Sequence, residues 1–371
     1  MSDIKVVLCG IKLANPVLTA PGPNVRTSMQ MLEAVKGGVG GIVSKTISTH
    51  PAKDIKPTIT RTFFHGVMNC ETWSEISYQD FLADLEAVKK TGIPLIVSLG
   101  YSAQQLSILG EIIEKEIDPH GYEFSTHYVG KEIEPLKQIA LSLKGKVDKP
   151  VFMKISPNSP NIENIARHLS EIVDGFVAIN SFGPVLDFDV EAIDSPLSSD
   201  FGQGWLSGPP IMPLGLRIVY QIAGIQNKPV IGVGGISSGS DAVKYMMCGA
   251  KAVGICSAAL THGPDIYGKV SRQIEQWLDQ HNYIELSDVY GLYAEKTAQR
   301  ITGSYNPVIN VNDKLCVGCG NCMSKCPNHA LFMDEQKKQV QVNADNCIGC
   351  GFCRGFCPQQ ALTIKRRTGS D

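Results

Sequence analysis

The sequence predicts a chain of the α/β class, in which a (β/α)8 TIM barrel is followed by a small cysteine-rich domain. Before residue 300, short β-branched apolar runs alternate with amphipathic stretches, and eight of these runs are candidate strands. Eight of the twelve cysteines lie between Cys316 and Cys357. A single hydrophobic core usually stops growing at about 250 to 300 residues. We therefore expect two domains, the barrel at residues 1–300 and the small domain at residues 306–366.

The eight apolar runs are the expected inner strands of the barrel. Strands that alternate with helical patterns indicate repeated βα units and a parallel sheet. Eight units in about 300 residues fit a closed barrel better than an open doubly wound sheet. The expected strands are residues 16–20, 41–45, 94–99, 122–126, 150–155, 175–180, 229–234 and 252–257.

Small and polar residues follow these strands at the end where barrel enzymes bind their ligands. Their convergence at one rim predicts a ligand site. The candidates are Ala20, Gly22, Lys45, Thr46, Ser98, Ser125, Thr126, His127, Lys154, Asn180, Ser181, Gly234, Gly235, Cys256 and Ser257.

A glycine turn, "VGGISSGSDAVKYMMCGA", follows the seventh strand and opens a helix. Free N–H groups at helix N-termini after the last two strands are a common phosphate site in barrels. A tight structural turn would explain the glycines equally well, but their position favours a phosphate-bearing cofactor. No G-x-G-x-x-G fingerprint opens a βαβ unit, so we expect no nicotinamide site in this chain.

The cysteine-rich domain contains two runs, "CVGCGNCMSKCP" and "CIGCGFCRGFCP". Their C-x2-C-x2-C-x3-C-P spacing is the bacterial pattern for a pair of four-iron clusters, in which the fourth cysteine of each run binds the other cluster. Zinc sites or a reactive dithiol are the alternatives, and both fit the doubled spacing less well. The segment between the runs predicts a short hairpin. The expected ligand sets are Cys316, Cys319, Cys322 and Cys357, and Cys347, Cys350, Cys353 and Cys326.

Charge and hydropathy give no reason to expect nucleic acid or a membrane as partner. The 34 basic and 36 acidic residues leave a formal charge of −2. The first residues lack the apolar stretch of a secretory signal, and no stretch has 18 uncharged apolar residues. We therefore expect a cytoplasmic protein. The oligomeric state stays open, and a homo-oligomer is compatible with the sequence.

From about Leu13 to Leu362 the chain resembles known flavoenzymes. The motifs that carry the resemblance are "NPVLTAPGP", "SKT", "PVFMKISPN", "INSFGP", "GWLSGPPIMPLGLRIV", "GVGGISSGSDAVKYMMCGAKAVGICSA" and both cysteine runs. The body resembles the dihydroorotate dehydrogenase family of FMN enzymes, and the whole chain is similar to the C-terminal part of dihydropyrimidine dehydrogenases. The resemblance implies an oxidoreductase for CH–CH bonds with FMN, a ferredoxin-like domain with two [4Fe–4S] clusters, and a ferredoxin or flavoprotein subunit as redox partner.

The resemblance also implies roles for the residues at the barrel rim. Lys154 would lie beside the pyrimidine part of the flavin, where a fixed cation stabilises the negative charge of the reduced ring. Asn180 and Ser181 would line the flavin or the substrate. Ala20, Gly22, Lys45 and Thr46 would meet the flavin, with Ser98 as a further cofactor-binding candidate, and Gly208, Gly234, Gly235, Cys256 and Ser257 would hold the FMN phosphate and ribityl chain.

The substrate half of the family pattern is different in this chain. Where the family has a stretch like "LNLSCPN", this sequence has "YEFSTHYVGK". His127 is the first candidate for proton transfer, followed by Tyr128 and Ser125, with Lys45 as a further catalytic candidate. One reading is therefore an oxidoreductase for a small molecule that is not a standard pyrimidine. The alternatives are an electron-transfer subunit without a substrate, or a divergent dihydropyrimidine or dihydroorotate dehydrogenase.

Overall fold

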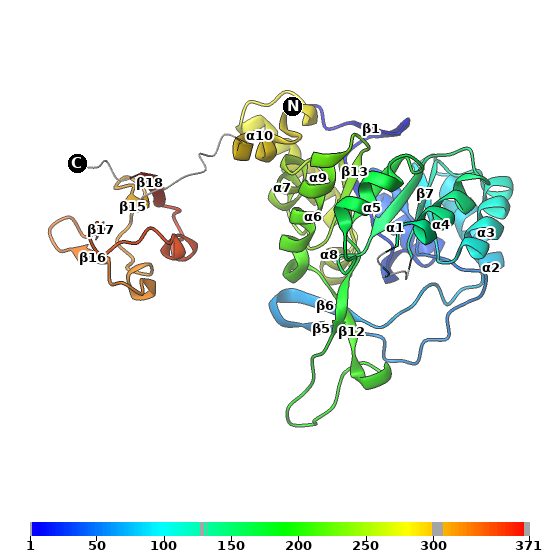
Figure 1. Ribbon diagram of the computed structural model, residues 1–371, viewed down its shortest axis with the longest axis horizontal. Helices are drawn as coiled ribbons and strands as arrows, with labels where there is room; N and C mark the ends of the chain where they lie inside the picture. Colours follow the sequence, from blue (N-terminus) through cyan, green and yellow to red (C-terminus); the bar gives the residue numbers. More distant parts are fainter. Residues whose placement is uncertain (1, 127–129, 131, 299–306, 367–371) are drawn as a thin grey trace. The chain divides into compact units, whose positions relative to one another are not determined.

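The computed structural model describes residues 2–126, 130, 132–298 and 307–366 (Figure 1). The chain divides into two compact units, Met1–Ala298 and Gln299–Asp371, and each unit is described by itself. Among the described residues, none of the helices combines the length and the apolar character that crossing a bilayer requires.

The first unit is built around an eight-stranded parallel sheet that closes into a barrel. The strand order is β3-β14-β13-β10-β9-β8-β7-β4, and a parallel bridge between Leu18 and Gly41 joins β3 to β4. All eight predicted strands are confirmed, although β8 begins one residue earlier than expected. Their bounds are β3 (Val17–Thr19), β4 (Ile42–Val43), β7 (Leu95–Leu99), β8 (Gly121–Phe124), β9 (Val151–Ile155), β10 (Gly175–Ala178), β13 (Val230–Val233) and β14 (Ala252–Ile255).

Helices surround the strands, and the helices α1 to α7 and α9 each bury apolar residues. In α3, Ser102 and Gln105 form a capping box, and Leu106, Leu109 and Ile113 recur at helical spacing on the buried face. The helices are α1 (Ser28–Lys36), α2 (Tyr78–Lys89), α3 (Ala103–Glu116), α4 (Glu134–Lys144), α5 (Ile162–Leu169), α6 (Met212–Ile225), α7 (Gly239–Met247), α8 (Ser257–His262), α9 (Ile266–Gln280) and α10 (Leu292–Ala298). A hairpin of β1 (Val6–Leu8) and β2 (Ile11–Leu13) precedes them.

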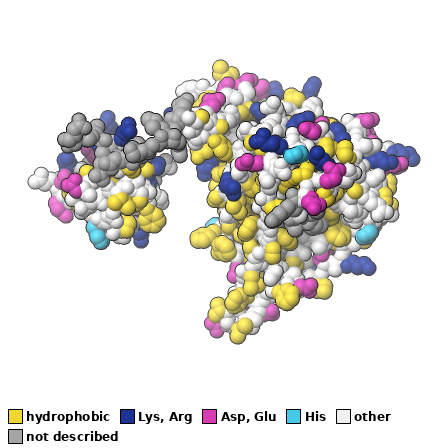
Figure 2. Space-filling view, viewed as in Figure 1, with side chains coloured by type: hydrophobic (Ala, Val, Ile, Leu, Met, Phe, Trp, Pro, Cys, Tyr) yellow, Lys and Arg dark blue, Asp and Glu magenta, His cyan; other side chains and the backbone are white. Residues whose placement is uncertain are grey.

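A second, antiparallel sheet projects from the barrel (Figure 1). Its order is β11-β12-β6-β5, with β5 (Ile59–Thr62), β6 (Gly66–Asn69), β11 (Phe182–Val185) and β12 (Gly204–Ser207). Two excursions of the chain, after β4 and after β10, meet in this sheet where β6 pairs with β12. Large apolar side chains of the excursions are exposed, with Phe64 at 80%, Ile193 at 83% and Phe201 at 89%, and Figure 2 shows apolar side chains gathered on the projection.

The second unit contains two antiparallel strand pairs. β15 (Pro307–Val311) pairs with β18 (Leu362–Arg366), and β16 (Leu331–Asp334) pairs with β17 (Gln339–Val342). The β16–β17 hairpin lies between the two cysteine runs, as predicted. Each run turns through two glycines in the left-handed region, where a side chain would strain the backbone. These glycines are Gly318, Gly320, Gly349 and Gly351.

Candidate active site

A pocket of about 370 Å3 lies at the C-terminal ends of the barrel strands. This volume is in the range of small-molecule sites in proteins. Loops from strands far apart in the sequence converge there, because the strands are parallel and all end at the same rim. Fourteen predicted site residues line the pocket, namely Ala20, Gly22, Lys45, Thr46, Ser125, Thr126, Lys154, Asn180, Ser181, Gly208, Gly234, Gly235, Cys256 and Ser257.

Ser98, expected at the cofactor, is not among the residues that line the pocket. Its side chain is fully buried, and its hydroxyl lies 2.8 Å from Thr46 Oγ1. Its backbone N–H donates to Ser44 Oγ in the neighbouring segment. The physical reason is that Ser98 lies within β7 and faces the adjacent strand, so it positions Thr46 instead of facing the pocket. His127 and Tyr128, the first two candidates for proton transfer, lie outside the described residues.

Two glycines of the pocket leave no room for a side chain. A Cβ atom on Gly22 would lie 2.3 Å from Cys256 Sγ. Gly235 has a φ of +74°, and a Cβ atom there would lie 2.8 Å from the carbonyl oxygen of Gly208. The result is a cradle of bare backbone beside β13 and the start of α7, which is the kind of surface that binds a phosphate through N–H groups.

Lys154, on β9, is buried and has a buried carboxylate as partner. Its Nζ lies 3.3 Å from Glu123 Oε1 on β8, and the two side chains are 6% and 2% exposed. No described group donates an aligned hydrogen bond to Glu123 Oε1, so the contact is an ion pair. Burial raises the pKa of Glu123, and the Lys154 ammonium acts in the opposite direction. A buried lone ammonium would be costly, and Glu123 offsets that cost.

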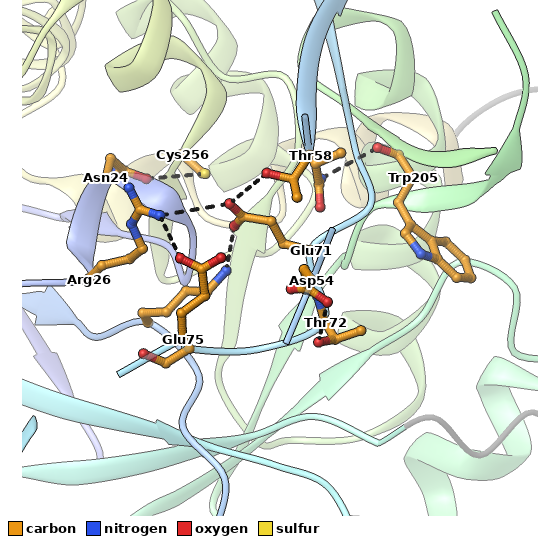
Figure 3. Close-up of polar contacts among 12 residues, drawn as sticks. Asn24, Arg26, Asp54, Thr58, Glu71, Thr72, Glu75, Trp205 and Cys256 are labelled. Atoms are coloured by element: carbon orange, nitrogen blue, oxygen red, sulfur yellow. Dashed lines mark hydrogen bonds and ion pairs between the residues drawn. The ribbon is translucent and has the colours of Figure 1, made fainter. Parts of the chain in front are cut away.

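A second buried ion pair joins Lys45 and Glu71 at the pocket wall. Lys45 Nζ lies 2.8 Å from Glu71 Oε2, and the side chains are 8% and 5% exposed. Thr58 donates a hydrogen bond of 3.3 Å to the other carboxylate oxygen, and Arg26 Nη1 lies 3.9 Å from it. Figure 3 shows the ion pairs of Arg26 with both Glu71 and Glu75. Glu71 follows β6 and was not predicted as a site residue.

The projecting sheet and neighbouring loops complete the pocket. They contribute Asn69, Trp205, Tyr101 and Asn158, none of which was predicted. Burial raises the pKa of the Tyr101 hydroxyl above its ordinary value. The side-chain carbonyl oxygen of Asn158 is buried and accepts no hydrogen bond from the described residues.

Three polar side chains complete the account of the predicted residues in the pocket. Asn180 Nδ2 donates to Ser125 Oγ over 3.3 Å, so the ends of β8 and β10 are joined. Cys256 donates to Asn24 Oδ1 over 3.3 Å. Burial raises the pKa of Cys256 to about 11, so its sulfur is a thiol at neutral pH and not a nucleophile.

In the second unit, each predicted ligand set lines a cavity of its own. One cavity is lined by Cys316, Cys319, Cys322 and Cys357, and the other by Cys326, Cys347, Cys350 and Cys353. Backbone N–H groups approach three of the sulfurs, those of Cys347, Cys326 and Cys357, at 3.5, 3.3 and 3.2 Å. Such N–H groups stabilise the charge of a thiolate-bound cluster. Four thiols around each cavity fit a [4Fe–4S] cluster.

The signals that could have found the unpredicted residues differ in strength. Glu123 is a charge within the apolar run "YEFST", and a buried charge needs a partner. Asn69 and Glu71 are two residues apart in "MNCETW", but nothing local to that segment indicates that it reaches the barrel rim. Trp205 and Tyr101 carry no signal of a site in the sequence.

Comparison with known proteins gives matches to both units. The dihydroorotate dehydrogenase family profile matches residues 123–278, and the 4Fe-4S dicluster domain profile matches residues 315–363.

Similar curated proteins include three archaeal ones named dihydroorotate dehydrogenase B (NAD(+)), catalytic subunit. The protein from Thermoplasma volcanium is 31% identical over 79% of this chain and 99% of its own length. Those from Methanocaldococcus jannaschii and Pyrococcus furiosus are 31% and 30% identical, over 79% and 78% of this chain and 98% of their own lengths. The aligned part accounts for nearly the whole of each relative.

Proposed function

The chain belongs to the dihydroorotate dehydrogenase family and is a flavin- and iron–sulfur-dependent oxidoreductase for CH–CH bonds, and we propose that its substrate is a small molecule other than a standard pyrimidine. The observation that carries the proposal is the pocket at the barrel rim, lined by the residues that the family resemblance assigns to FMN. Its opposite side is formed by the projecting sheet. The stretch that follows β8, "STHYVGK", lacks the asparagines and the cysteine with which the family grips and deprotonates a pyrimidine.

The described residues fit FMN. The bare backbone at Gly208, Gly234 and Gly235 would hold the phosphate through N–H groups. A Cβ atom at Gly235 would lie 2.8 Å from the Gly208 carbonyl oxygen, so a side chain there would disturb this surface. Lys154 and Lys45 would lie against the ring. When bound, FMN exchanges two electrons with a carbon–carbon bond of the substrate.

Glu123, 3.3 Å from Lys154 Nζ, offsets the cost of burying an ammonium group at the pocket. The Asn180 amide and the Ser125 hydroxyl are within hydrogen-bond distance of each other and both face the pocket, so they can orient a polar group of the substrate. The substrate loses or gains a hydride at one carbon, and the neighbouring carbon must exchange a proton with the protein.

His127 is the proposed group for this proton, with Tyr128 and Ser125 as alternatives. A positioned acid or base contributes about 10²- to 10⁴-fold to such a step, and imidazole titrates near neutral pH. In His127→Gln with FMN content unchanged, flavin reduction by substrate should slow by about a hundredfold or more while reduction through the clusters stays the same. An unchanged rate and pH profile would move the assignment to Tyr128.

Two [4Fe–4S] clusters would connect the flavin to a redox partner. Each cluster exchanges one electron at a time, whereas the substrate exchanges two, so clusters are suited to pass electrons between flavin and another protein. The relatives are named as catalytic subunits of NAD(+) enzymes, and a name of that kind implies a second subunit. A ferredoxin or a flavoprotein subunit is the proposed partner.

The test is an anaerobic screen in which candidate small molecules are mixed with the purified protein while the flavin spectrum is followed. Dihydroorotate, dihydrouracil and dihydrothymine serve as reference compounds beside other compounds with a C=C bond conjugated to a carbonyl group. At least one compound outside the pyrimidine references should reduce or reoxidise the flavin without a partner protein. Turnover with dihydroorotate alone would refute the substrate proposal. A flavin that responds to no small molecule would favour an electron-transfer subunit.

A further inference from the structure

The Lys45–Glu71 pair determines the charge at one wall of the pocket. Glu71 lines the pocket, its side chain is 5% exposed, and one of its oxygens lies 2.8 Å from Lys45 Nζ. Ammonium and carboxylate at this distance form a short, charge-assisted hydrogen bond. Lys45 is therefore already occupied by a carboxylate of the protein itself, and a carboxylate ligand would have to displace Glu71 to bind it.

The surroundings of Glu71 hold it in place. Thr58 donates to Oε1 over 3.3 Å, and Arg26 Nη1 lies 3.9 Å from the same oxygen. Arg26 is shared with Glu75, at 3.7 Å, and Glu75 is also paired with Lys56 at 3.0 Å. Three cations, Lys45, Arg26 and Lys56, thus contact two carboxylates. Lys45 is the one of these cations that lines the pocket, and a ligand carboxylate would have to compete with Glu71 for it.

The charge of the other lysine that lines the pocket is also balanced by a buried carboxylate. Lys154 Nζ lies 3.3 Å from the carboxylate of Glu123, which is 2% exposed. Both lysines that line the described part of the pocket thus have a buried glutamate of their own. A ligand carboxylate near either pair would face a like charge within a few ångströms in a poorly hydrated site, where repulsion is strong.

We propose that Glu71 is a specificity-determining residue that excludes carboxylate-bearing ligands from the pocket. The substrate class is then an uncharged molecule with a C=C or CH–CH bond next to a carbonyl or amide group, without a carboxylate. This inference rests on the proposed function, since it concerns the substrate of the same site. An uncharged substrate would distinguish this chain from enzymes that accept dihydroorotate, because dihydroorotate carries a carboxylate.

Orotate and orotamide test the proposal, because they differ only in replacing the carboxylate with an amide. Their dissociation constants are measured from the change in the flavin spectrum of the intact holoprotein. The unmodified protein should bind orotamide about tenfold or more tightly than orotate. Glu71→Gln keeps the shape of the side chain and frees Lys45, so it should strengthen orotate binding about tenfold or more and change orotamide binding by less than about threefold. Glu111→Gln on α3, which removes the carboxylate of an exposed ion pair with Lys146, is the matched control and should leave both constants unchanged.

Three outcomes would overturn the proposal. The first is an unmodified protein that binds orotate as tightly as orotamide, which needs no variant to observe. The second is that Glu71→Gln does not strengthen orotate binding. This outcome includes the case in which neither the unmodified protein nor any variant binds orotate detectably. The third is an equal gain for both ligands. Binding constants are measured without turnover, so this test is independent of the anaerobic screen described above. In that screen the proposed function fails if no small molecule changes the redox state of the flavin.

Discussion

Replacing Lys154 by methionine should destabilise the barrel through the carboxylate that it leaves behind. Glu123 is 2% exposed and its ionic partner is Lys154, 3.3 Å away. Removing one member of a buried ion pair typically costs about 3 to 5 kcal/mol, because the other charge stays buried without compensation. We expect Lys154→Met to lower the free energy of unfolding by this amount at pH 8.

The loss should depend on pH in a direction that the structure determines. Burial raises the pKa of Glu123 in the folded protein, and the variant removes the ammonium that lowers it. The unfolded value is about 4.3. Between this value and the raised one, the folded state binds more protons than the unfolded state, so stability falls as pH rises by about 1.4 kcal/mol per unit. The deficit should therefore shrink as the pH is lowered from 8 toward 5.

Urea unfolding followed by tryptophan fluorescence measures this effect in the barrel alone. All three tryptophans of the chain, Trp73, Trp205 and Trp277, lie in the first unit. FMN-free protein is used so that weaker flavin binding does not contribute to the apparent stability.

Two control variants test whether the loss of stability comes from the buried carboxylate. Lys144→Met removes a lysine whose partner, Asp174, is 30% exposed and also accepts from the Val151 N–H, so it should cost only about 0 to 1 kcal/mol. The double variant Glu123→Leu/Lys154→Met replaces the pair with apolar groups and should regain most of the lost stability. A loss below about 1 kcal/mol in Lys154→Met that does not vary with pH would refute the reasoning, because a buried uncompensated carboxylate could not behave in that way.

The remaining predictions concern the two cofactors. Cys319→Ser should lower the iron content of anaerobically purified protein from about eight to about four atoms per chain without changing the FMN content; zinc in place of iron in the unmodified protein would contradict the cluster assignment. Gly235→Ala should weaken FMN binding about tenfold or more, since its Cβ atom would lie 2.8 Å from the Gly208 carbonyl oxygen at a positive φ. Gly224→Ala, whose Cβ atom meets nothing within 4 Å, should bind FMN normally. Equal FMN affinities of the two variants would contradict the proposal that the backbone at Gly235 holds the phosphate. A chain ending at residue 305 should keep the reaction between substrate and flavin but lose turnover with the partner protein, and fast reduction of this barrel by NADH would count against the clusters as the route for electrons.

The barrel strands were predictable because parallel strands buried on both faces are nearly continuous apolar runs. β7 and β9, for example, are buried at every residue. The projecting sheet was not predictable. Its strands are short and partly exposed, and its central pairing brings Trp205 beside Asn69, 136 residues away. No local pattern specifies a pairing over that distance.

The sequence by itself predicted which cysteines line each of the two cavities and which glycines line the pocket. The cysteine spacing sets which thiols can surround a cluster, and the turn after β13 needs glycine wherever it lies. Only the tertiary structure decided which charges meet. Glu123 is opposite Phe152 in the β8–β9 register, and Lys154 follows two residues later, on the same face of the sheet. Glu71 reaches Lys45 because the excursion after β4 folds back over the barrel rim. Ion pairing depends on which segments become neighbours, and that is a property of the fold and not of any one stretch of the chain.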